Sequence, residues 1–176
     1  MKFYTRTGDS GETSLMHGER VPKDDERIEC LGNLDELSSF IGLAISTIKH
    51  EEIKNYLIKI QKIIYFAGAE IADTKNLARM IKEEHLEELE KITDEYSSKI
   101  EPLKHFILPG GSESSSLIHV CRAVCRRLER SLVRLNKKEK LNPLLLKYFN
   151  RLSSFLFVLA LYINKIEGYK ELEAKF

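Results

Sequence analysis

Five arginines lie within one stretch of the chain, residues 119–134, which reads HVCRAVCRRLERSLVR. The guanidinium group is a rigid fork of donors that fits carboxylate and phosphate oxygens, so the chemistry that this stretch could support is anion binding. At 100° per residue around a helix, one flank of the apolar stripe carries Arg122, Arg126, Glu129 and Arg130. Arg127 and Arg134 project on the other side. Arginine runs also form solvated, salt-bridged helix faces, so the stretch alone predicts either a phosphate site or an exposed charged face.

A second segment that could bind an anion lies near the start of the chain, where residues 3–15 read FYTRTGDSGETSL. Gly8 and Gly11 let backbone N–H groups turn toward an anion. Side-chain hydroxyl groups add donors at Thr5, Thr7, Ser10, Thr13 and Ser14. Lys23 follows, and no GxxxxGK[ST] pattern of a Walker A loop is present. We interpret the segment as a loop that holds a polyphosphate against the arginine flank. Its composition is equally compatible with a mobile chain terminus, which is the alternative interpretation.

Composition and charge limit the classes of protein to consider. The 176 residues are 43% hydrophobic and 31% charged, which is ordinary for one globular domain spanning 1–176. The formal net charge of +1 gives no global field that would attract nucleic acid or anionic lipid, so an anion site must be a local cluster. We expect that no apolar run approaches the roughly 20 residues that span a bilayer. Because no signal peptide precedes the loop, we expect a cytoplasmic protein with neither nucleic-acid nor membrane partners.

The three cysteines do not indicate a disulfide framework. Cys30, Cys121 and Cys125 are an odd number in a chain of this size. Cys121 and Cys125 are four residues apart with His119 close by, which permits a metal site. Since no CxxC pair or second ligand pair occurs, buried thiols on a helix are the favoured interpretation.

Apolar residues recur at helical spacing in five segments. The stripes include Leu34 to Ile48, Ile53 to Ile71, Leu86 to Tyr96, Leu117 to Leu135 and Leu145 to Ile166. This periodicity, with almost no alternation of period two, predicts an all-α five-helix bundle with an N-terminal nucleotide-binding loop. The last segment also has apolar residues opposite its stripe, at Phe157, Val158 and Leu161. It is therefore either a subunit interface or a central helix.

Two other functional classes fit an all-helical chain less well. A ferritin-like di-iron bundle needs paired Glu-x-x-His motifs, and none of the five histidines follows a glutamate at that spacing. A non-enzymatic helical regulator would bind phosphate or nucleic acid through the arginine helix, but the near-neutral net charge and the lack of a basic stripe on an exposed face do not favour it.

Five motifs in order carry a resemblance to a known family. They are YTRTGDSGETSL, GNLDELSSFIGLA, FILPGGS, CRAVCRRLER and NRLSSFLFVLA, and they extend from residue 4 to residue 160. Together they closely resemble the PduO-type ATP:cob(I)alamin adenosyltransferases. The resemblance implies a five-helix bundle that works as a homotrimer with active sites between subunits. It implies transfer of the 5′-deoxyadenosyl group of ATP to the cobalt of a reduced corrinoid, release of triphosphate and a requirement for Mg²⁺.

The resemblance also assigns residues to roles. Lys23 and the loop would wrap the triphosphate, the loop residues being Thr5, Arg6, Thr7, Gly8, Asp9, Ser10, Gly11, Thr13 and Ser14. The nucleotide site would be completed from across the interface by Arg127, Glu129, Arg130 and Asn150. Asp35 matches an acid that pairs across subunits with an arginine matching Arg126, and these two act with Arg130 in catalysis. Phe106 matches an aromatic residue on the lower face of the corrinoid. The alternative is that Phe106 only packs in the hydrophobic core of the bundle.

One residue departs from the family pattern, and no side chain is assigned to a metal. Ser154 stands where the family commonly has Asp, which could weaken a polar contact on the corrin side. Mg²⁺ is expected to be held mainly by the phosphates of ATP.

The implied chemistry agrees with the residue types. Cob(I)alamin is a strong nucleophile, so the protein needs no Ser, Cys or His nucleophile. Its tasks are to orient C5′ of the ribose and to stabilise the departing triphosphate, which suits Arg, backbone N–H groups and Mg²⁺. Apolar groups below the corrin would favour loss of the lower ligand and hence reduction of Co(II) to Co(I). An electron-donating reductase is the expected protein partner.

Overall fold

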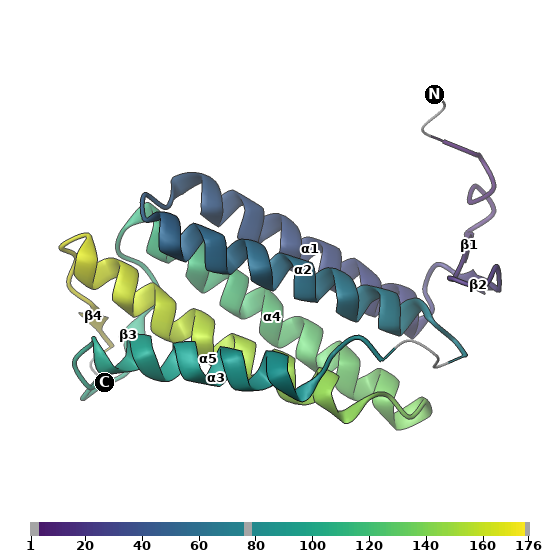
Figure 1. Cartoon of the computed structure of the whole chain (residues 1–176). Helices are drawn as coiled ribbons and strands as arrows, with labels where there is room; N and C mark the ends of the chain where they lie inside the picture. The colour runs from purple at the N-terminus through teal and green to yellow at the C-terminus, as the bar shows by residue number, and fades with distance from the viewer. Residues whose placement is uncertain (1–3, 76–78, 175–176) are drawn as a thin grey trace.

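The computed structural model describes residues 4–75 and 79–174, and these form a bundle of five helices (Figure 1). The helices are α1 (Glu26–Thr47), α2 (Glu51–Ala72), α3 (Glu83–Ser98), α4 (Glu113–Lys138) and α5 (Pro143–Ile166). Each corresponds to one of the five apolar stripes, so the predicted all-α five-helix bundle is confirmed.

Helix α4 lies at the centre of the packing. It packs against both α1 and α5, while α2 covers α1 and α3 covers α5. The core runs along these contacts and contains side chains that are fully buried, among them Leu37, Leu57, Leu128 and Phe155. Because α4 has neighbours on two sides, its remaining faces are the ones left to present the arginines.

Local capping explains where the three helices nearest the candidate site begin. The Asp25 side chain accepts the Arg27 N–H at 2.7 Å, and the Ser112 hydroxyl accepts the Ser115 N–H at 3.2 Å. Asn142 caps α5 in the same way, and Pro143 follows it at the first helical position. Such caps satisfy N–H groups that the first turn leaves unpaired.

Helix α5 is apolar on more than one side because it packs against both α3 and α4. By length and composition it could cross a membrane, so the expectation that no run approaches that length is wrong. The high hydropathy of α5 is explained by its packing, because 56% of its most apolar window is buried inside the chain. Opposite the core stripe, Leu161 is buried and Phe157 and Val158 are half-buried. The central-helix interpretation thus accounts for Leu161.

In the described part of the chain, four short strands that periodicity did not predict flank the bundle. Strands β1 (Glu12–Ser14) and β2 (Arg20–Pro22) pair antiparallel and form a hairpin in the N-terminal segment. Figure 1 shows this segment projecting from the end of the bundle where α1 begins. Strands β3 (Ile107–Leu108) and β4 (Leu172–Glu173) pair at the opposite end, and the Ala174 N–H donates to the Phe106 carbonyl at 2.7 Å.

Candidate active site

The N-terminal segment folds into a tight turn around its glycines. The Gly11 N–H donates to the Gly8 carbonyl at 3.2 Å, and Gly11 has a positive φ of 85° that suits glycine. Arg6 also has a positive φ, 63°. The Lys23 N–H donates to the Gly11 carbonyl at 2.8 Å. A Cβ added at Gly8 would lie 3.1 Å from the Lys23 ammonium nitrogen, so the structure brings Lys23 and this turn together as predicted.

Arg20, which sequence reasoning did not select, braces the same segment. Its Nη2 donates to the Thr7 carbonyl at 2.8 Å, and its Nη1 lies 3.4 Å from the Ser14 hydroxyl. It also forms an ion pair with Glu12 at 3.5 Å. The side chains of Thr5 and Thr7 are hydrogen-bonded to each other at 2.8 Å. The segment is therefore an organised hairpin whose donors are largely exposed.

A cavity of about 430 Å³ between α4 and α5 collects most of the predicted arginine flank. Its lining residues are Arg126, Glu129, Arg130, Val133, Arg134 and Asn150; we call it the arginine cavity. Asn150 donates to the Glu129 carboxylate at 2.9 Å and accepts from Arg151 at 2.8 Å. Arg134 also lines this cavity, while its Nη2 donates to the Ser131 hydroxyl at 3.0 Å, on the side of α4 that faces Asn33 of α1.

Arg127 faces α1 instead. Its Nε donates to the Asn33 side-chain oxygen at 2.9 Å, and its guanidinium group forms an ion pair with Glu36. Asn33 in turn donates to the Ser131 hydroxyl at 3.1 Å. Within one chain, Arg127 therefore lies on a different side of α4 from Arg126 and Arg130. The assignment of Arg127 to the nucleotide site stays a prediction.

Asp35 and Arg126 are both exposed, and within the described residues they form no ion pair with each other. Asp35 lies on α1, whereas Arg126 lines the cavity on the α5 side of α4. None of the residues that line the arginine cavity belongs to the described part of the N-terminal segment. Within one chain, the described part of the loop therefore does not contribute to the arginine cavity.

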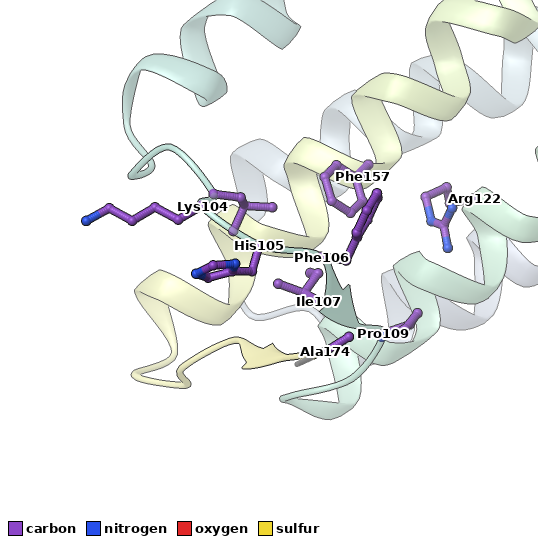
Figure 2. A pocket seen from close by; sticks show the side chains of 9 residues that line it. Lys104, His105, Phe106, Ile107, Pro109, Arg122, Phe157 and Ala174 are labelled. Atoms are coloured by element: carbon purple, nitrogen blue, oxygen red, sulfur yellow. The ribbon is translucent and has the colours of Figure 1, made fainter. Parts of the chain in front are cut away.

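A second, larger cavity of about 990 Å³ lies where the segment before α4 meets α5 (Figure 2). Phe106 lines it with 81% of its surface exposed, so Phe106 does not pack in the bundle core. Phe157 and Arg122 lie around the same cavity, with the Arg122 guanidinium carbon 5.8 Å from the centre of the Phe157 ring. We call this the aromatic cavity. From the sequence, Phe157 is recognisable only as an apolar residue opposite the core stripe of α5.

Buried groups support the wall of the aromatic cavity. The His119 ring lies edge-on to Phe157 with 6.0 Å between centroids and is 3% exposed. Burial, and secondly the Arg122 guanidinium, lower the pKa of His119 to about 4, so this imidazole is neutral at pH 7. Burial and the nearby Arg126 also lower the pKa of Arg122. A neutral His119 adds no positive charge beside Arg122.

The three cysteines are fully buried, which confirms the buried-thiol interpretation. Burial is the main cause that raises the pKa of Cys30 and of Cys121 to about 12. These thiols are therefore protonated and poor nucleophiles at neutral pH. Among residues 4–75 and 79–174, no three His, Cys, Asp or Glu side chains are grouped to hold a metal ion.

Ser154 lies away from Phe106. It lines a cavity of about 270 Å³ beside α3, together with Thr93, Asp94 and Arg151. Arg151 is held there by an ion pair with Glu90 at 2.9 Å. Within one chain, the residue that departs from the family pattern is thus outside the aromatic cavity.

Helix α4 contributes to both the aromatic cavity and the arginine cavity, one turn apart. Arg122 lines the aromatic cavity and Arg126, four residues later, lines the arginine cavity. The fold and these sites define a helical-bundle enzyme that can hold a phosphate-bearing molecule beside a large apolar one.

Comparison with known proteins then gives the family. Residues 3–163 match the family described as cobalamin adenosyltransferase. The chain belongs to this family.

Individual relatives agree over nearly the whole chain. The chain is 43% identical to the corrinoid adenosyltransferase MMAB of Mus musculus, over 97% of this chain and 76% of the relative. It is 40% identical to the corrinoid adenosyltransferase of Bacillus subtilis (strain 168), over 98% of this chain and 92% of the relative. A phenylalanine-to-alanine variant of a PduO-type ATP:corrinoid adenosyltransferase from Lactobacillus reuteri, complexed with cobalamin and ATP, superposes with a TM-score of 0.95. Its sequence is 32% identical, and the match covers 99% of this chain and 100% of that one.

Proposed function

We propose that this chain transfers the 5′-deoxyadenosyl group of ATP to the cobalt of a reduced corrinoid and releases triphosphate. The observation that carries this function is the pair of cavities one turn apart on α4, one lined by three arginines and the other by Phe106 and Phe157. A charged, phosphate-bearing substrate fits the first, and the broad apolar face of a corrin ring fits the second.

The reaction is a displacement at carbon. The Co(I) electron pair attacks C5′ of the ribose, a Co–C bond forms, the C5′–O bond breaks, and triphosphate leaves with the bonding electrons. Because Co(I) is itself the nucleophile, the chain needs only to orient C5′ and to stabilise the charge that grows on the leaving group. Arg126 and Arg130 serve that second purpose, with Glu129 and Asn150 holding the nucleotide beside them.

We propose that complete active sites form between subunits of a homotrimer. The glycine turn and Lys23 lie apart from the arginine cavity in one chain, so a loop from one subunit would meet the cavity of the next. Exposed Asp35 and Arg126 would pair across that interface, and Arg127 would reach the nucleotide from the α1 side. The exposed apolar residue Val133, 42% accessible at the arginine cavity, would be covered by the same contact.

Phe106 is assigned to the lower face of the corrin. An exposed ring at the mouth of an apolar cavity would exclude water and the corrinoid's own nucleotide tail from cobalt. Loss of the lower ligand makes Co(II) easier to reduce, and an external reductase would supply the electron.

Mg²⁺ is proposed to enter with the triphosphate. Mg²⁺ in nucleotide enzymes keeps several waters and is bound through phosphates and one or two carboxylates. The chain's own contribution is the arginine and backbone donors around the remaining phosphate oxygens. ATP as substrate and the burial of α5 within the bundle support a cytoplasmic location.

A direct assay tests the function. Purified protein is incubated with ATP, Mg²⁺ and chemically reduced cobalamin, and formation of the cobalt–carbon bond is followed by the absorption spectrum. We expect adenosylcobalamin and one equivalent of triphosphate. Binding of both substrates with no alkylcobalamin formed would reject the proposal.

A further inference from the structure

The tip of the N-terminal hairpin is fastened to the C-terminal end of α2. His17 Nε2 lies 2.7 Å from the Asp73 carboxylate, and the Met16 N–H donates to the Ala72 carbonyl at 3.3 Å. Leu15, next to them, is 6% exposed and anchors the tip in the bundle surface. These contacts join segments 56 residues apart in the sequence.

The buried carboxylate of Asp73 needs hydrogen-bond donors around it. Its side chain is 2% exposed, and it is the C-cap of α2, where the negative end of the helix dipole disfavours a carboxylate. It accepts the Lys75 N–H at 3.0 Å as well as the His17 contact. A buried carboxylate is costly unless its oxygens are hydrogen-bonded, so the imidazole that approaches it from the hairpin stabilises this position.

The hairpin needs this anchor because it is small. Strands β1 and β2 have three residues each, and an isolated two-stranded hairpin is at best marginally stable in water. The glycine turn and Lys23 lie at the other end of the hairpin from His17, and two residues after Lys23 the chain reaches Asp25, the N-cap of α1. The hairpin is therefore held at one end by its entry into α1 and at the other by the tip contacts with α2, and the two attachments together set the direction in which the turn points.

We propose that His17, through its contact with Asp73, is a positioning residue for the ATP-binding loop. The inference rests on the proposed function, because it assigns the loop to ATP. His17 touches no substrate. The contact reduces the number of orientations that the loop samples before ATP binds. Less conformational entropy is then lost when ATP orders the loop, so ATP binds more tightly.

The experiment compares His17→Ala, His17→Gln and a matched control, His50→Ala. His50 is an exposed histidine at the other end of α2 whose side chain makes no capping hydrogen bond. In His17→Ala we expect KM for ATP to rise by about five- to tenfold, with kcat and KM for the corrinoid changed less than about twofold. His17→Gln retains a side-chain N–H donor and should recover most of the ATP affinity. His50→Ala should match the wild type.

Amide hydrogen exchange gives a second measurement that does not need activity. In His17→Ala, the N–H groups of Leu15 and Met16 should exchange faster, while those in the middle of α2 stay protected. Unchanged KM for ATP in His17→Ala with faster exchange would overturn the positioning role, and unchanged exchange would overturn the anchor itself. If the wild-type protein makes no adenosylcobalamin, the proposed function is rejected. The hydrogen-exchange measurement would still show whether the contact between His17 and Asp73 anchors the hairpin.

Discussion

Asn150 and Glu129 join α5 to α4 at the arginine cavity, with 2.9 Å between the amide nitrogen and the carboxylate. The bond fixes the position of a carboxylate in the cavity that Arg126 and Arg130 also line. It also orients Asn150, whose side-chain oxygen accepts from Arg151.

Turnover should fall even when Arg130 is replaced by a residue that keeps the positive charge. Among the described residues Arg130 forms no ion pair, so its fork of donors is open to a ligand in the arginine cavity. Arg130→Lys loses the fork and should lower kcat with ATP by at least about tenfold. Steady-state kinetics with reduced cobalamin measure this. Arg79→Lys, an exposed arginine between α2 and α3, is the matched control; near-wild-type turnover in both variants would show that Arg130 is only a surface residue.

Asp35 and Arg126 should behave as partners in different subunits. Asp35→Arg and Arg126→Asp each place like charges together, and we expect each to lower activity and trimer content. The double exchange restores opposite charges and should recover activity by about fivefold or more over the worse single variant. Light scattering after gel filtration reports the trimer. An exchanged pair no better than the worse single variant would contradict direct pairing.

The helices could be predicted from sequence because each buries one continuous stripe, as Leu34 to Ile48 does in α1. The hairpin could not, since three-residue strands carry too little alternation to recognise. Arg134 serves two faces of α4, because its long side chain lines the arginine cavity and still donates to Ser131 beside α1. The His17–Asp73 contact depends on where the chain returns after α2, and no local pattern specifies that. The residue roles at the substrates came from motifs, and they stay predictions.

His119 should make folding sensitive to acid. Its pKa is about 4 in the folded chain against about 6.5 when unfolded, so the unfolded state binds the proton first as pH falls. The associated stability is complete above about pH 6.5 and is lost progressively toward pH 4, up to roughly 3 kcal/mol. His119→Leu removes this titration, so the wild type should lose more stability than the variant between pH 7 and pH 4.5. Urea unfolding at both pH values measures the difference; equal losses would place the titration elsewhere.

Phe106 should affect the corrinoid and leave the fold intact. Because the ring is 81% exposed, Phe106→Ala should cost less than about 1 kcal/mol of stability and leave ATP affinity unchanged. Phe155→Ala is the matched control: that ring is fully buried, and its loss should cost about 3–5 kcal/mol. In Phe106→Ala, water and the nucleotide tail regain access to cobalt. The fraction of bound Co(II) corrinoid without a lower ligand, measured by electron paramagnetic resonance, should fall sharply. An unchanged Co(II) spectrum would remove Phe106 from the corrin face, since the exposed ring would then have no effect on the metal it is proposed to shield.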